Sequence, residues 1–235
     1  MSANGPPREE RALPRRGEGS PEARPGTDAP AHAWGVTAIA AAAVVAVSAL
    51  LAANGIVPGE SAVRAAVLDV STSELRSLAR TIRPLGTWWG IVPGVLLLLA
   101  ASRHARHRWW LWGLTLIAAP LAGEALQEFV GRLRPKGPAF GFPSGHATAM
   151  AAFAVATIYL VGKSGLRRLL RMVIGFVLVM LTLVMGMSRI VLDAHWPLDV
   201  IAGFALGAAG AAAAAWWDAS CPWRPREEPP QAHAP

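Results

Sequence analysis

The sequence contains little charge and almost no cysteine or tyrosine. Only 16% of its 235 residues are charged, whereas 53% are hydrophobic. A soluble domain of this length would need a more polar surface, so this composition argues against that class. The single cysteine, Cys221, can form neither an internal disulfide nor a cysteine-based zinc site.

The hydrophobic residues are gathered into long runs separated by short polar loops. A helix of about 20 residues crosses the ~30 Å hydrocarbon core of a bilayer. The second run is short and contains Pro93, so it needs flanking residues to span. We expect an all-α, polytopic membrane protein with six transmembrane helices, at residues 34–53, 87–102, 109–129, 145–162, 170–187 and 196–217.

Polar segments stand at both ends of the chain. Residues 1–33 are rich in Pro, Gly, Ala, Arg and Glu and show no apolar periodicity, which predicts a disordered tail. The expected organisation is a disordered cytoplasmic tail at 1–33, a membrane domain at 34–217 and a second such tail at 218–235. The first apolar run could instead be a cleaved signal sequence, but its long polar preface argues against that.

The connection between the first two runs has the pattern of a helix on the membrane surface. Ser71 and Glu74 fit a capping box, and apolar residues recur after them at helical spacing. Arginines surround this apolar stripe, as in interfacial helices. A role in guiding a substrate is the alternative that we favour less.

The basic residues are distributed unevenly among the loops. The formal net charge of +7 could suggest nucleic acid binding, but the charges lie in tails and short loops between apolar runs. Most of them fall in the two tails and in the second and fourth loops, which share one side of a six-span protein. The positive-inside rule therefore predicts a multi-pass protein of the cell membrane with both termini cytoplasmic. We expect no nucleic acid partner.

Three polar clusters remain, and all lie at the ends of spans that the topology places outside the cytoplasm. They are residues 132–136, residues 143–146, and residues 188–189 together with His195 and Asp199. Because the third and fifth loops lie on the same side, these clusters can meet in space. The sequence therefore predicts one polar site at the extracytoplasmic surface.

The residue types in these clusters indicate an anion site. Arginine presents a planar fork of donors that matches phosphate oxygens. Ser144 and Gly145 lie where a helix begins, and free N–H groups there can hold an anion. His146 follows at once, within reach of that anion. Taken singly, a basic residue at a helix end is more often an interface anchor, and a lone histidine is more often structural.

His195 and Asp199 are four residues apart, so they share one face of a helix that begins there. Pro197 between them is tolerated in a first turn. A carboxylate beside one imidazole nitrogen fixes the tautomer and leaves the other nitrogen free to attack. Two histidines and an aspartate could bind a metal instead. Arginines aimed at the same place would repel a cation, so we expect no metal and no cofactor.

These residues resemble the type 2 phosphatidic acid phosphatase family, which also includes bacterial undecaprenyl diphosphate phosphatases and vanadium haloperoxidases. Two motifs of that family are complete. Pro-Ser-Gly-His stands at 143–146, and Ser-Arg-x5-His-x3-Asp stands at Ser188, Arg189, His195 and Asp199. The resemblance covers about residues 127–203. It implies the helical bundle of acid phosphatases and vanadium haloperoxidases.

The first motif, Lys-x6-Arg-Pro, is altered. It ends in Arg134 and Pro135, but Gln127 stands where the family has lysine. Glutamine donates a hydrogen bond but carries no charge. Either Lys136 or Arg132 supplies the missing charge, or the protein is a weak or degenerate phosphatase. We favour the first, because every residue that handles a proton is present.

The resemblance also implies roles and an activity. His195 would attack phosphorus, Asp199 would orient it and His146 would protonate the leaving oxygen. Phosphate oxygens would be held by Arg134, Ser144, Gly145, Arg189 and Gln127. The expected enzyme is a metal-independent lipid phosphatase acting through a phosphohistidine on phosphatidic acid, phosphatidylglycerol phosphate or undecaprenyl diphosphate. The alternatives are vanadate-dependent haloperoxidation and a degenerate, non-enzymatic lipid-binding or transport-related protein.

Overall fold

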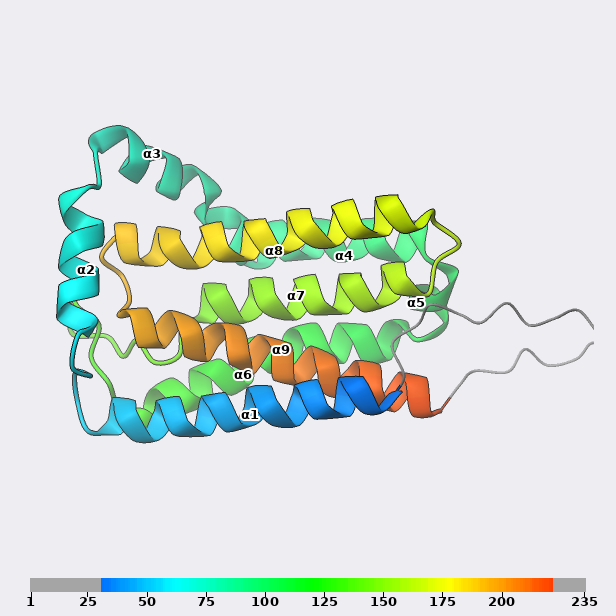
Figure 1. Ribbon diagram of the computed structural model, residues 1–235, viewed down its shortest axis with the longest axis horizontal. Coiled ribbons are helices and arrows are strands. Elements are labelled where there is room, and N and C mark those ends of the chain that lie inside the picture. Colours follow the sequence, from blue (N-terminus) through cyan, green and yellow to red (C-terminus); the bar gives the residue numbers. More distant parts are fainter. Residues whose placement is uncertain (1–30, 222–235) are drawn as a thin grey trace, which may run out of the picture.

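The computed structural model describes residues 31–221, and within that range every regular element is a helix (Figure 1). The sole β pairing among these residues is an isolated bridge between Leu133 and Phe140. The elements are α1 (Ala31–Ala53), α2 (Glu60–Asp69), α3 (Ser73–Ile82), η1 (Arg83–Gly86), α4 (Trp88–Ala101), α5 (Arg103–His107), α6 (Trp109–Val130), α7 (Gly145–Gly162), α8 (Arg168–Val191) and α9 (Pro197–Ser220).

Six of these helices run side by side as one bundle: α1, α4, α6, α7, α8 and α9 (Figure 1). Each lies close to one of the six apolar runs that the sequence predicts. The helices α2 and α3 lie across one end of the bundle, which we call the α2 end. The opposite end, the α5 end, carries the first residue of α1 and the last residue of α9.

The centre of the bundle is the contact between α7 and α9. A Cβ atom at Gly203 would lie 2.6 Å from the carbonyl oxygen of Ser144, and one at Gly207 would lie 2.2 Å from that of Thr148. Glycine at these two positions therefore lets the helix backbones touch, as small residues do in membrane bundles. The outer helix α8 instead exposes large apolar side chains such as Leu169 and Phe176, the surface expected to face lipid.

The number of membrane crossings is confirmed only in part. Among the described residues, α1, α7, α8 and α9 are long and apolar enough to span a bilayer. A fifth candidate is the pair Ser73–Gly86 and Trp88–Ala101, bent by 53°. The 22 residues of α6 are enough to cross at 1.5 Å each, but α6 carries Glu124 and Glu128 and is not among the four. The protein is an all-helical membrane protein, and six spans remain a prediction.

The connection between α1 and α4 contains more structure than its sequence pattern indicates. The predicted surface helix is present as α3, but its N-cap is Thr72, whose hydroxyl accepts a hydrogen bond from the Leu75 amide at 3.2 Å. The prediction of a cap at Ser71 was therefore off by one residue. The sequence analysis did not predict α2, which packs against α8 and α9.

The tails predicted at 1–33 and 218–235 lie outside the described residues except at their inner edges, since α1 begins at Ala31 and α9 continues to Ser220. The expectation of disorder in these segments stays a prediction. Both described termini lie at the α5 end, so the chain passes along the bundle an even number of times (Figure 1).

A buried carboxylate fastens the α5 end. Asp218 of α9 accepts a hydrogen bond from the Tyr159 hydroxyl of α7 at 2.5 Å. It also lies 2.6 Å from Nε2 of His104 in α5 and 3.3 Å from Nε of Arg108. The Trp34 ring of α1 packs edge-on against Tyr159, with 5.4 Å between ring centroids. One carboxylate therefore links the ends of several helices.

We predict that Asp218→Ala lowers the free energy of unfolding by about 3 kcal/mol, because His104, Tyr159 and Arg108 lose a shared buried partner. Thermal unfolding in detergent measures the change. The matched control is Asp69→Ala, since Asp69 is an exposed carboxylate at the end of α2. Equal melting temperatures for the two variants would show that the cluster does not stabilise the bundle.

Candidate active site

His195 lies in the loop between α8 and α9 and is 2% exposed. Its Nδ1 lies 2.8 Å from the carbonyl oxygen of Gly141 and 3.7 Å from Oδ2 of Asp199. A carbonyl oxygen only accepts, so Nδ1 carries the proton and Nε2 keeps its lone pair. Burial lowers the pKa of His195 below its ordinary value, although Asp199 acts in the opposite direction. A lowered pKa keeps the imidazole neutral, and so nucleophilic, to more acid pH.

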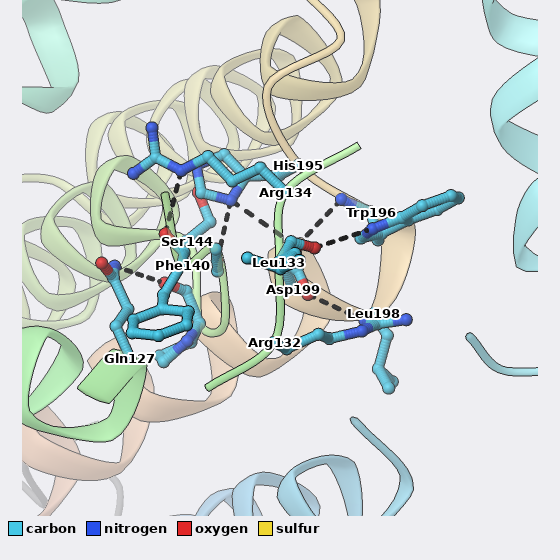
Figure 2. Close-up of polar contacts among 12 residues, drawn as sticks. Gln127, Arg132, Leu133, Arg134, Phe140, Ser144, His195, Trp196, Leu198 and Asp199 are labelled. Atoms are coloured by element: carbon cyan, nitrogen blue, oxygen red, sulfur yellow. Dashed lines mark hydrogen bonds and ion pairs between the residues drawn. The ribbon is translucent and has the colours of Figure 1, made fainter. Parts of the chain in front are cut away.

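Asp199 is fully buried in the first turn of α9 and joins several segments (Figure 2). Its Oδ2 accepts a hydrogen bond from the Trp196 amide at 2.9 Å, and its Oδ1 accepts one from Nη1 of Arg132 at 2.8 Å. Its main-chain carbonyl accepts a hydrogen bond from the Ser144 amide at 2.9 Å. Asp199 therefore holds the loop of His195, the loop after α6 and the start of α7 in one arrangement.

Arg132 is held in turn by Glu60, the first residue of α2. The two side chains form a bidentate ion pair, and Arg132 is 6% exposed. Glu60 also accepts a hydrogen bond from the Leu198 amide at 2.8 Å. Glu60, Arg132 and Asp199 thus form a buried ionic chain behind His195. Glu60 was not predicted as a site residue, since a single glutamate in a long connection gives no local signal.

Four of the five phosphate-binding residues predicted from the motifs, all except the buried Ser144, line a cavity together with His195. Arg134, Gly145, His146, Arg189 and His195 line one cavity of about 690 Å³. Nε of Arg134 donates to the carbonyl oxygen of Phe140 at 3.0 Å, which aims the guanidinium (Figure 2). The cavity thus receives side chains from the loop after α6, the start of α7, the end of α8 and the loop before α9.

Several buried polar atoms at or next to this cavity lack a partner within residues 31–221. Nε2 of His146 and Nε and Nη1 of Arg189 belong to residues of the lining, whereas Oγ of Ser144 belongs to the fully buried residue just before Gly145 and does not line the cavity. Ser144 is the N-cap residue of α7, yet its hydroxyl makes no capping bond. Buried donors are nearly always satisfied in proteins, so such a group of open donors indicates a site for an acceptor-rich ligand.

The altered first motif has a structural role. Nε2 of Gln127 donates to the carbonyl oxygen of Pro143 at 3.0 Å and so braces the Pro-Ser-Gly-His loop (Figure 2). Neither Arg132 nor Lys136, the two cations predicted to replace the family lysine, can contact a ligand in the cavity. Arg132 is engaged by Glu60 and Asp199, and Lys136 is exposed and does not line the cavity.

The same cavity continues as an apolar groove between α4 and α6, two helices that hardly touch each other. From Gly113 to Gln127, both in the lining, a helix extends about 21 Å. The groove is lined on α4 by Ile91, Val92, Val95 and Leu96, and on α6 by Leu116, Ile117, Pro120 and Leu121. Among the described residues, no group of three or more His, Cys, Asp or Glu is placed to hold a metal ion.

A helical membrane bundle that holds two imidazoles and several arginines around one cavity has the groups that a membrane phosphatase needs. Residues 108–222 match the sequence profile of the PAP2 superfamily. These residues form a PAP2 superfamily domain, and the phosphatases that share this domain support a hydrolase activity for this chain. The resemblance stated from the motifs is thereby confirmed.

Known proteins that are similar to this chain are also phosphatases. The crystal structure of a PAP2 type phosphatidylglycerolphosphate phosphatase from Bacillus subtilis superposes with a TM-score of 0.66 at 22% identity, covering 76% of this chain and 95% of that chain. This likeness shows the fold. Phosphatidylglycerophosphatase B of Bacillus subtilis is 24% identical over 163 residues, which are 66% of this chain and 80% of that protein.

Two further relatives are more similar over shorter stretches. A decaprenylphosphoryl-5-phosphoribose phosphatase of Mycobacterium tuberculosis is 34% identical over 127 residues, 48% of this chain and 64% of that protein. A lipid A 1-phosphatase of Porphyromonas gingivalis is 36% identical over 104 residues, 41% of this chain and 22% of that protein. The chain therefore spans less than two thirds of either relative.

We predict that Arg132→Ala lowers the free energy of unfolding by about 3–5 kcal/mol, because Glu60 and Asp199 are left buried without a partner. Thermal unfolding in detergent measures the loss. Lys136→Ala, four residues further along the same loop and exposed, is the matched control and should unfold like the wild type. If Arg132→Ala melted no earlier than this control, the buried ionic chain would have no stabilising role.

Proposed function

We propose that the chain hydrolyses a lipid phosphate monoester or diphosphate through a phosphohistidine at His195. The observation that carries this proposal is the continuity of the cavity. Its polar end has His146, His195, Arg134 and Arg189, and its other end is the apolar groove between α4 and α6. A phosphate on a long hydrocarbon chain matches both ends at once.

The proposed chemistry gives each group one role. Nε2 of His195 attacks phosphorus while the bond to the leaving oxygen breaks, and His146 gives that oxygen a proton. Water then attacks the phosphohistidine, His146 takes a proton from the water, and inorganic phosphate leaves. Arg134, Arg189 and the start of α7 hold the phosphoryl oxygens in both steps. Phosphoryl transfer depends mainly on such alignment and charge stabilisation.

The groove supports a substrate with one long chain lying between α4 and α6. An extent of about 21 Å suits an acyl or isoprenyl chain in the bilayer. Phosphatidic acid, phosphatidylglycerol phosphate and undecaprenyl diphosphate all fit this description. The relatives act, by their names, on phosphatidylglycerophosphate, lipid A and a decaprenylphosphoryl phosphoribose. Apolar side chains such as those of the groove contact any hydrocarbon chain, so the headgroup decides the choice.

We predict that His195→Ala reduces phosphate release by about three orders of magnitude or more, because the nucleophile is lost. The assay measures phosphate released from a panel of lipid phosphates in detergent micelles, with EDTA present throughout. Cys221→Ser serves as the matched control, since Cys221 is exposed at the far end of the bundle. Undiminished release by His195→Ala would exclude the covalent mechanism, and loss of wild-type release in EDTA would exclude a metal-independent one.

The proposed orientation places the α2 end on the extracytoplasmic side of the cell membrane and both termini in the cytoplasm. The excess of Lys and Arg in the tails and in the loops at the α5 end supports it. In a Cys221→Ser background, Lys136→Cys should react with an impermeant thiol reagent in intact cells, because Lys136 is exposed at the α2 end. Arg106→Cys, exposed at the α5 end, should react only after lysis. The reverse pattern would invert the topology.

A further inference from the structure

Arg83 is a cation at the cavity that no family motif includes. It is the first residue of η1 and lines the same cavity as Arg134, His146 and Arg189. Within residues 31–221 its side chain makes no hydrogen bond and no ion pair. The carboxylate of Glu124 also lines the cavity, yet it pairs with none of these arginines. The guanidinium of Arg83 is therefore available to a ligand.

Close packing fixes the turn that carries Arg83. A Cβ atom at Gly86 would lie 3.0 Å from Sδ of Met185 and 3.1 Å from Cβ of His146. Glycine here lets η1 lie against the first turn of α7 and the side of α8 without displacing these two side chains. The Thr87 amide closes the turn by donating to the carbonyl oxygen of Pro84 at 3.0 Å. The backbone of Arg83 is thereby held beside the catalytic histidines.

Positive charges outnumber negative ones around the cavity, since Arg83, Arg134 and Arg189 line it together with Glu124. The guanidinium groups of Arg83 and Arg134 repel the positive charge of Arg189. Arg83 and Arg189 also exert an electrostatic effect on His146. Like charges gathered around one hollow repel each other unless an anion lies between them. Three guanidinium groups at one cavity therefore match a phosphoryl group, whose oxygens accept from planar donor forks.

Gln127 leaves the polar end of the cavity without the cation that the family motif has there. A site that follows the family motif would have a lysine at this position, but the amide here is neutral and its Nε2 is occupied by the Pro143 carbonyl. Arg132 and Lys136 do not reach the cavity. We propose that Arg83 binds the phosphoryl oxygens of the substrate and supplies the charge that Gln127 does not provide. This inference rests on the proposed phosphatase function.

The test compares Arg83→Gln with Arg80→Gln. Arg80 is exposed one turn earlier, in α3, and lines a neighbouring hollow that Arg83 also borders, but it does not line the cavity of His195. With phosphatidic acid in detergent micelles, Arg83→Gln should lower kcat/KM by about 10- to 100-fold, the range for loss of a charged hydrogen bond. Arg80→Gln should stay within about threefold of wild type, as for a surface charge. Equal effects of the two variants would overturn the proposal.

A rescue experiment tests whether the two positions share one role. Adding Gln127→Lys to Arg83→Gln should restore kcat/KM by about tenfold or more, since a cation again faces the phosphate. Gln127→Lys in the wild-type background should gain less than about threefold. A double variant no more active than Arg83→Gln would overturn the claim that Arg83 replaces the family lysine.

Anion binding separates this inference from the proposed function. Inorganic phosphate should raise the melting temperature of the wild type and of Arg80→Gln, and the rise should be lost in Arg83→Gln. Arg83 is exposed and unpaired, so its substitution leaves the fold intact. A wild type that binds phosphate but releases none from lipid phosphates would refute only the phosphatase proposal. The same phosphate-induced rise in Arg83→Gln would refute only the role of Arg83.

Discussion

The buried contact between Arg132 and Asp199 is the interaction on which the site depends. Asp199 receives hydrogen bonds from the loop after α6 and from the loop before α9, and its main chain receives one from the start of α7. A carboxylate with almost no exposure is stable only while such partners surround it. Glu60 completes the arrangement by holding Arg132 from α2. Any variant that separates this pair therefore disturbs the position of His195 as well.

Packing of small residues supplies the second constraint. The contact at Gly203 and Gly207 brings the backbone of α9 against the first turns of α7, and so brings His195 toward His146. The outer helices α4 and α6 stay apart, and the groove between them joins the polar end of the cavity to the side of the bundle. Tight packing in the centre fixes the reacting groups, while loose packing at the edge admits a long chain.

Much of the fold and part of the site could be predicted from local patterns. The apolar runs predict helices from their length and hydropathy, because a segment inside a bilayer must satisfy its own backbone hydrogen bonds. His146, Arg134, Arg189, Asp199 and His195 could be named because their spacing matches known motifs. Their catalytic and binding roles remain predictions. The helix α2 and the carboxylate of Glu60 were missed because their place is set by contacts with residues far along the chain.

The sequence by itself determined an all-helical membrane protein and the residue types of an anion site, since both depend on composition and short spacings. Only the tertiary structure decided which cation faces the cavity. Arg132 lies within the altered first motif, yet its side chain is paired with Glu60 and Asp199. Arg83 is far from that motif in sequence, yet it lines the cavity. Distances between such side chains depend on how the helices pack, and they cannot be predicted from hydrophobic periodicity.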